Sequence, residues 1–222
     1  MSSEGSASLL PVHGFVLAGG TSSRMGVDKA TLEFCGRPMV EIAVEKLRGF
    51  CAEVGIAGNR ENLARFAPVA REERVNAGPG AGVEAGLKAA RQEWALFVPV
   101  DVPLVPAELL RRWCVEALRV GMTVSYLGVL NKQPVFCLLR RERLASFTSL
   151  LDGGERRLEV LLNAAATADD CASWMYDERD LYGDRNYQGP DDETLAHWFA
   201  NVNTPQELTE AEGWAAQVGW SR

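Results

Sequence analysis

A run of apolar residues that ends in two glycines, followed by hydroxyl and cationic side chains, is the part of this sequence best suited to chemistry. Phe15–Ala18 is apolar, Gly19 and Gly20 follow, and Arg24 and Lys29 come next. Glycines lack the Cβ atoms that keep backbone N–H groups away from phosphate oxygens, and the two cations add positive charge. The segment predicts a polyphosphate-binding loop. The alternative is a strand that turns through a Gly-Gly corner, with two solvated cations after it.

This loop matches neither of the common phosphate-binding motifs. A dinucleotide site requires G-x-G-x-x-G, and a P-loop requires G-x-x-x-x-G-K followed by Ser or Thr. Here five residues separate Gly20 from Gly26, and no Lys-Ser or Lys-Thr follows. Neither motif therefore fits this loop.

A carboxylate stands at the end of the most apolar predicted strand. Trp94–Val100 leads directly into Asp101 and then Val102-Pro103. Open α/β sheets bind ligands at the carboxyl ends of their strands, so we interpret Asp101 as a metal ligand. With only two histidines and no C-x-x-C pair, an oxygen-ligated ion such as Mg²⁺ is favoured. The alternative, that Asp101 caps the helix expected near Pro106, is weakened by the gap between them.

Two further segments carry residues that could meet an anion. Gly78, Gly80 and Gly82 precede a helix expected at Val83–Gln92, so the backbone there could approach a phosphate. A flexible connection is an equally good interpretation of these glycines. Arg156-Arg157 is expected to open a helix, where cations are unfavourable to the helix dipole, which hints at an anionic partner. An exposed surface is the commoner explanation.

The elements that must position these residues alternate between strand and helix. Right-handed crossovers between such strands give an α/β fold, a three-layer αβα sandwich around a mostly parallel, Rossmann-like sheet. The predicted strands are Val12–Ala18, Glu53–Ala57, Pro68–Ala70, Trp94–Val100, Thr123–Leu127, Pro134–Leu139 and Trp198–Val202. The predicted helices begin at or near Pro38, Glu61, Val83, Pro106, Arg141, Glu155 and Pro205.

Length and composition favour one domain. The 222 residues suffice for a single α/β domain, here 11–222, after a small polar leader at 1–10 that we expect to be disordered. We find no apolar segment long enough to span a membrane and no signal peptide, so a soluble, cytoplasmic protein is expected. The five cysteines are scattered, which indicates neither a disulfide framework nor a zinc site.

The net charge of −7 has a single location. Residues 169–193 hold nine acidic residues against Arg179 and Arg185, which accounts for the whole excess. The rest of the chain is neutral and offers no basic face for nucleic acid. The stretch has no clear period, so we interpret about 168–196 as an acidic inserted loop.

Four segments together resemble one family. They are Leu17–Lys29, which follows the pattern L-A-G-G-x-S-x-R-M-G-x-x-K, Gly78-Pro79 with the later glycines, Pro99–Pro103, and Asn201–Pro205. Together they are similar to the molybdenum cofactor guanylyltransferases, which belong to the nucleotidyltransferases that join a nucleoside triphosphate to a phosphorylated acceptor. The resemblance covers most of residues 12–210.

The resemblance implies a role for each matching residue. GTP contacts are implied at Leu17, Ala18, Gly19, Gly20, Lys29, Asn59, Glu73, Gly78 and Asp101. Catalytic roles are implied for Arg24, Lys29, Asp101 and Asn203, with Mg²⁺ on Asp101. Acceptor contacts are implied at Arg156, Arg157, Asn201 and Asn203. The family usually has an aspartate where this chain has Glu72-Glu73; we choose Glu73 because the residues after it match better.

The reaction implied is transfer of GMP from GTP to the terminal phosphate of molybdenum-bound molybdopterin, with release of pyrophosphate. The acceptor phosphate is already ionised, so positioning and charge neutralisation would carry catalysis. The resemblance leaves room for transient contacts with molybdoenzymes or their chaperones, and we expect a monomer.

Two alternatives stay open. The first is an enzyme of the same fold with another nucleotide, either a molybdopterin cytidylyltransferase or a sugar-phosphate nucleotidyltransferase; Gly19-Gly20 and the short chain argue against these. The second is a non-catalytic GTP-binding adaptor that docks a partner through the acidic stretch. Retention of Arg24, Lys29 and Asp101 together argues against the adaptor.

Overall fold

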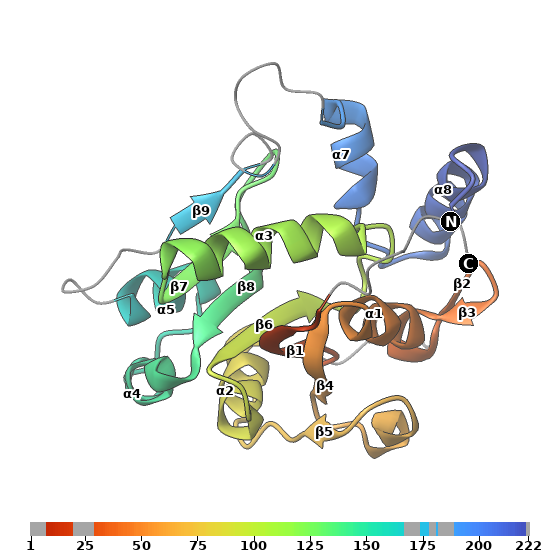
Figure 1. The fold of residues 1–222 in the computed structure, drawn as a ribbon. Coiled ribbons are helices and arrows are strands. Elements are labelled where there is room, and N and C mark those ends of the chain that lie inside the picture. Colours follow the sequence, from red (N-terminus) through yellow and green to blue (C-terminus); the bar gives the residue numbers. More distant parts are fainter. Residues whose placement is uncertain (1–7, 20–28, 167–173, 178–180, 182–188, 221–222) are drawn as a thin grey trace.

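The protein is organised around one seven-stranded sheet. The computed structural model describes residues 8–19, 29–166, 174–177, 181 and 189–220. The sheet has the order β5-β4-β1-β6-β8-β7-β9, and β8 alone of these strands runs antiparallel to its neighbours (Figure 1). The strands are β1 Leu10–Leu17, β4 Cys51–Ala57, β5 Val69–Ala70, β6 Trp94–Pro99, β7 Val124–Leu127, β8 Gln133–Arg140 and β9 Trp174–Tyr176.

The central strands end level with one another. Leu17 of β1 pairs with Ala57 of β4 on one side and with Pro99 of β6 on the other. All three strands are parallel, and their carboxyl-terminal halves are mostly buried, which is why their sequences are rich in apolar residues. The residues that follow them, Ala18, Gly58 and Val100, therefore meet at one edge of the sheet.

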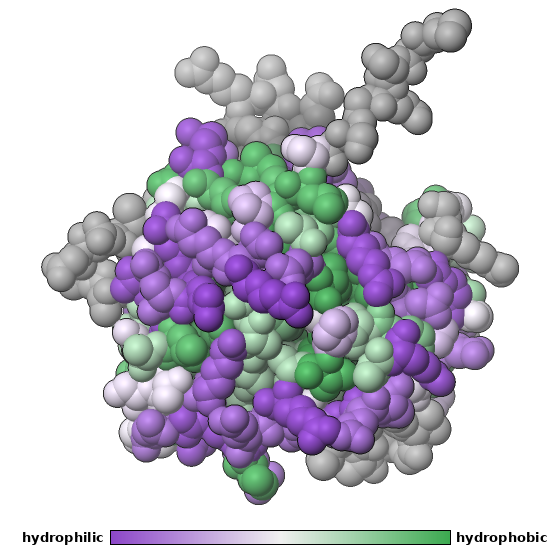
Figure 2. All heavy atoms as spheres, turned by 60° about the horizontal axis from the view of Figure 1, so that its bottom comes forward, coloured by the Kyte–Doolittle hydropathy of each residue, from purple (hydrophilic) through white to green (hydrophobic). Residues whose placement is uncertain are grey.

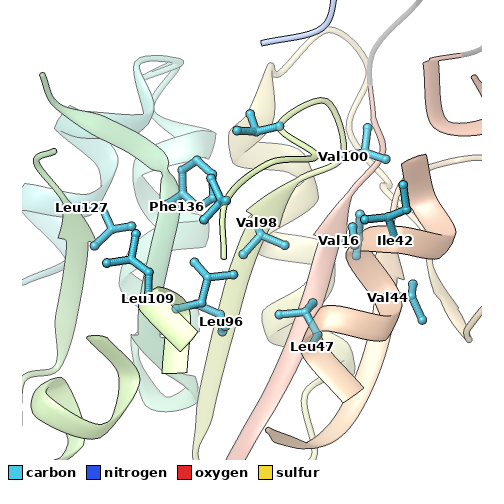
Figure 3. Packing of buried hydrophobic residues seen from close by; sticks show 14 of the residues in the cluster. Val16, Ile42, Val44, Leu47, Leu96, Val98, Val100, Leu109, Leu127 and Phe136 are labelled. Carbon is cyan, nitrogen blue, oxygen red and sulfur yellow. The ribbon is translucent and has the colours of Figure 1, made fainter. Parts of the chain in front are cut away.

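Helices cover both faces of the sheet. On one face lie α1 Met39–Arg48, α3 Ala107–Val120, α7 Asp192–Trp198 and α8 Pro205–Gln217, and on the other lie α2 Pro79–Ala89, α4 Leu144–Asp152 and α5 Leu158–Ala165. Each set packs on its own hydrophobic cluster, and Figure 3 shows part of the first, with Val16 of β1, Ile42 of α1 and Leu109 of α3. Two clusters on opposite faces of one sheet confirm the predicted three-layer α/β sandwich.

The glycine-rich segment after residue 77 is part of a helix. The sequence predicts a helix from Val83, whereas α2 begins at Pro79, because proline is well tolerated in a first helical turn. A Cβ on Gly80 would lie 2.8 Å from Leu161 of α5, and one on Gly82 would lie 2.9 Å from Leu17. These glycines let α2 approach its neighbours closely, so the interpretation as a flexible connection is wrong.

The chain after residue 152 differs most from the sequence-based prediction. The expected strand Trp198–Val202 is absent, because α7 ends at Trp198 and the N–H groups of Phe199 and Ala200 bond back into that helix. The predicted acidic loop at 168–196 contains β9, which extends the sheet, and most of α7. Helix α5 begins at Leu158, so Arg156 and Arg157 precede it instead of opening it.

A small hairpin was not predicted. Strands β2 Glu33–Phe34 and β3 Arg37–Pro38 pair antiparallel around Cys35 and Gly36, whose φ angles are 51° and 78°. Both values are left-handed, as a tight primed hairpin turn requires. The N–H of Cys35 donates to a carboxylate oxygen of Glu212 on α8 over 2.7 Å, which ties the hairpin to the end of the chain.

The surface is mostly polar. Hydrophilic residues cover much of the face in Figure 2, and hydrophobic residues there form smaller areas between them. Within the described ranges, none of the helices combines the length and the hydropathy that crossing a membrane requires.

Candidate active site

A cavity of about 860 Å³ lies at the carboxyl ends of β1, β4 and β6. Its volume is in the range of small-molecule sites, and its position is the crevice where open α/β sheets bind ligands. The wall is formed by Leu17, Ala18, Gly19, Ala30, Asn59, Arg60, Glu72, Arg74, Val75, Asn76, Ala77, Gly78, Pro79, Gly82, Pro99, Val100, Asp101 and Val135.

Backbone hydrogen bonds fix the floor of this cavity. Ala18 N–H donates to the Ala57 carbonyl over 2.9 Å, and Val100 N–H donates to the Leu17 carbonyl over 3.2 Å. Gly58 lies against the same strand end, where an added Cβ would stand 3.0 Å from the Ala18 carbonyl oxygen. These hydrogen bonds fix the end of β1, so that Leu17, Ala18 and Gly19 lie in the cavity wall.

The structure separates the two adjacent glutamates. Glu72 is half-buried in the cavity wall, and its carboxylate lies within 3.2 Å of the Cβ position of Gly82. Burial raises the pKa of Glu72. Glu73 is not among the wall residues; its side chain is 73% exposed and pairs with Lys88 at 2.6 Å. The residue chosen from the sequence, Glu73, therefore lies outside the cavity wall, and its neighbour Glu72 lies in it.

Asp101 is positioned by three neighbouring segments. β6 delivers it to the cavity wall, and its carbonyl oxygen accepts from Val202 N–H over 2.8 Å. Lys46 of α1 donates to the carbonyl of Pro103 in the same loop. Helix α3 begins at Ala107 with Pro106 at its N-cap, so Asp101 does not cap that helix.

The surroundings of Asp101 suit one kind of metal site. Among the described residues we find no group of three or more His, Cys, Asp or Glu side chains that could hold an ion. Asp101 shares the wall of this nucleotide-sized cavity with one other carboxylate, Glu72. Mg²⁺ is commonly bound through one or two carboxylates, keeps several waters and takes its other ligands from substrate phosphates. The residues present therefore fit Mg²⁺ bound through Asp101 and the substrate.

Several wall residues were not predicted from the sequence. They include Arg60, Arg74, Val75 and Asn76. Burial lowers the pKa of Arg60, which follows the predicted Asn59 contact directly. The only signal in the sequence was position: Arg60 lies in the loop that follows β4, and the other three lie between Glu72 and Gly78. Their types follow no pattern specific enough to identify them.

The predicted acceptor residues lie next to the cavity, outside its wall. The carbonyl oxygen of Arg156 is 3.8 Å from the Cβ position of Gly78, and the Arg157 side chain pairs with Glu155 at 3.1 Å. Val202 bonds to Asp101, so Asn201 and Asn203 flank that contact. Gly20 and Arg24 lie outside the described residues. Lys29 begins a short 3-10 helix at Lys29–Thr31, and its side chain is not described.

Comparison with known proteins agrees with this geometry. Residues 14–168 match the family model described as the MobA-like NTP transferase domain. The chain belongs to this family. It is a nucleotidyltransferase, and the matched range contains the second half of β1, the cavity loops and Asp101.

Relatives of this MobA-like transferase span nearly its whole length. A molybdenum cofactor guanylyltransferase from Polynucleobacter asymbioticus is 31% identical over 208 residues, covering 89% of this chain and 94% of the relative. Another of that name, from Acidovorax sp., is 33% identical over 219 residues, covering 91% and 95%. The predicted resemblance to that family is confirmed.

The fold of this MobA-like transferase also has a solved counterpart. The crystal structure of molybdopterin-guanine dinucleotide biosynthesis protein A from Archaeoglobus fulgidus superposes with a TM-score of 0.71 at 21% identity. The superposition covers 92% of this chain and 99% of that one. At this identity the match concerns the fold, and it agrees with the nucleotidyltransferase type of sandwich.

Proposed function

We propose that this chain transfers GMP from GTP to the terminal phosphate of molybdenum-bound molybdopterin, giving the guanine dinucleotide form of the cofactor and pyrophosphate. The observation that carries the proposal is that Glu72, Asp101 and the Leu17–Gly19 backbone line one cavity of nucleotide size. The names of the full-length relatives point to the same reaction.

Glu72 is suited to select the base. A carboxylate can accept hydrogen bonds from both the N1–H and the 2-amino group of guanine, and neither cytosine nor adenine offers that pair of donors. Asn59 lies in the same wall and can add a further contact. Because Glu72 is half-buried, a base that cannot donate to its carboxylate would leave that carboxylate without a partner, which costs binding free energy.

The phosphate side of the site would work by positioning and charge neutralisation. An acceptor phosphate oxygen forms a bond to the α-phosphorus of GTP, the bond from that phosphorus to the β-phosphate oxygen breaks, and pyrophosphate leaves with the electron pair. The backbone of Gly19, Gly20 and Gly78 would hold the triphosphate, and Arg24 and Lys29 would neutralise the leaving group. Mg²⁺ held by Asp101 would supply further positive charge at the phosphates.

The acceptor would be held by the segments next to the cavity. Asn201 and Asn203 flank Val202, whose N–H donates to the Asp101 carbonyl, and this supports a role for them near the phosphates. Arg156 and Arg157 precede α5, and the backbone carbonyl of Arg156 lies near Gly78, which supports a contact between this segment and a phosphorylated pterin. An ionised phosphate nucleophile needs no general base, and we assign none.

The test is pyrophosphate release by purified protein with Mg²⁺ and molybdenum-loaded molybdopterin, with GTP and CTP offered in parallel. We expect release with GTP only and a fall of about 10²-fold or more in Asp101→Asn, because a carboxylate oxygen is lost from the metal site. Release with CTP would overturn the base assignment. No release with either nucleotide, with GTP still bound, would favour a non-catalytic adaptor.

A further inference from the structure

The loop that carries Glu72 is held mainly by side chains. Between residues 71 and 77 we find no backbone–backbone hydrogen bond to any other described residue, although Ala77 at its end is buried. Asn76 and Gly78 take left-handed φ angles of 54° and 62°. A loop of this kind has little stability of its own, so the orientation of Glu72 depends on whatever ties the loop to the helices.

Arg74 supplies the strongest of these ties. Its Nε donates to one carboxylate oxygen of Glu84 over 2.7 Å, and its Nη2 donates to the other over 3.0 Å. Glu84 lies on α2 with only 2% of its side chain exposed, and Thr148 of α4 donates to it over 2.8 Å. A buried carboxylate is costly unless it is paired in this way, so the geometry of the pair is narrowly defined.

A second carboxylate also holds the guanidinium. Nη2 of Arg74 lies 2.7 Å from a carboxylate oxygen of Asp152 at the end of α4. The hydrogen bonds to Glu84 and Asp152 raise the pKa of Arg74, and the bond from Arg74 lowers that of Glu84. Two carboxylates balance the charge of Arg74, although it lines the cavity. It is therefore poorly suited to serve as a free cation for phosphate.

We infer that Arg74 is a positioning residue, which sets the preference for guanine by pinning the Glu72 loop to Glu84 of α2 and Asp152 of α4. The inference rests on the proposed function, since it assumes that Glu72 meets the base. Nothing in the family match assigns a role to this pair. The alternative role for Arg74 is direct contact with the nucleotide phosphates, and the two roles predict opposite effects of removing Glu84.

The test compares binding of GTP and ITP by the full chain with Mg²⁺, using Arg74→Lys, Glu84→Gln and Asp152→Asn. ITP lacks the 2-amino group, so the ratio of the two dissociation constants reports base selection. If Arg74 positions the loop, Glu84→Gln weakens GTP binding on the order of tenfold and reduces the preference for GTP over ITP. Arg74→Lys shows the same two losses, because a lysine cannot pair with both carboxylate oxygens of Glu84 as the guanidinium does. Asp152→Asn, at a 63% exposed side chain, gives a smaller change in the same direction without threatening the fold.

Opposite results would overturn the inference. If Glu84→Gln leaves GTP binding unchanged or tightens it, or if Arg74→Lys keeps wild-type selectivity, Arg74 acts directly or not at all. Thermal melts show whether each variant is folded. If Glu84→Gln is unfolded, the GTP and ITP dissociation constants of Asp152→Asn provide the test instead. Failure of the wild-type chain to bind GTP would instead overturn the proposed function, and with it this inference.

Discussion

The carboxylate of Glu72 occupies the space that a side chain on Gly19 would need. An added Cβ on Gly19 would meet Oε1 of Glu72 first and would lie 3.2 Å from its Cδ. The absence of a side chain at Gly19 therefore serves two purposes: it exposes the backbone of the strand end and admits the carboxylate beside it. Gly19, the predicted phosphate-binding glycine, and Glu72, the proposed base-selecting carboxylate, therefore pack directly against each other.

Replacing Glu72 by Gln should reduce the preference for GTP over ITP and CTP. A glutamine keeps one acceptor but turns an amide N–H₂ toward the donor edge of guanine, so we expect about 1–3 kcal/mol of selectivity to be lost. Competition binding with the three nucleotides measures this directly. Glu73→Gln is the matched control, because Glu73 is exposed and pairs with Lys88. A loss of selectivity in Glu73→Gln with none in Glu72→Gln would restore the original sequence-based choice.

The same substitution should make the free protein more stable at neutral pH. Burial raises the pKa of Glu72, so the folded state binds its proton more readily than the unfolded state does. The free energy of unfolding then falls as pH rises through that range, and ionised Glu72 costs stability at pH 7. Urea unfolding at pH 7 and pH 4 should show that Glu72→Gln gains more at the higher pH. An equal gain at both would contradict this account.

The sequence predicts the floor of the site well and its loops poorly. The apolar runs that end at Ala18 and before Asp101 can only be buried parallel strands, so their carboxyl ends had to meet at one edge. No such rule decides whether Glu72 or Glu73 faces inward, because an irregular loop has no period. Likewise Phe199 and Val202 are buried, and their apolar side chains favour a strand in the sequence. In the structure, however, the N–H of Phe199 bonds to the end of helix α7, and the N–H of Val202 bonds to the Asp101 carbonyl.

Close packing of α2 predicts that Gly86→Ala destabilises the protein. An added Cβ would stand 2.9 Å from Phe97 Cζ and 3.2 Å from Phe15. Overpacking of this kind costs about 1–3 kcal/mol, more than the gain of up to about 1 kcal/mol from replacing a helical glycine. Gly213→Ala is the control: Gly213 is exposed on α8 and a Cβ there meets nothing within 4 Å. Chemical denaturation should show a lower free energy of unfolding for Gly86→Ala and a higher one for Gly213→Ala. An increase for Gly86→Ala would mean that Phe97 and Phe15 can move to make room for the added methyl group.

A buried hydrogen bond between α3 and β7 predicts a second core effect. The indole N–H of Trp113 donates to Ser125 Oγ over 2.7 Å, and both side chains are fully buried. Ser125→Ala leaves that N–H without its acceptor, so we expect a loss of about 1–3 kcal/mol in the free energy of unfolding. Ser149→Ala, at an exposed position of α4, should change it by only a few tenths of a kcal/mol. Similar losses in both variants would show that a general property of serine replacement is responsible.

His13 should make the protein less stable in mild acid. Its ring is 6% exposed, stacks on Phe15 at 4.1 Å, and accepts a hydrogen bond from the Arg91 N–H over 3.3 Å. Burial lowers the pKa of His13 most, and Arg91 adds to this while Glu53 opposes it. The unfolded chain therefore binds this proton more readily, and the free energy of unfolding falls as pH drops below about 6.5. His13→Gln keeps an acceptor for Arg91 and cannot take up the proton, so its melting temperature should fall less between pH 7.5 and about 5.5. Parallel curves for the two proteins would show that another group controls the acid response.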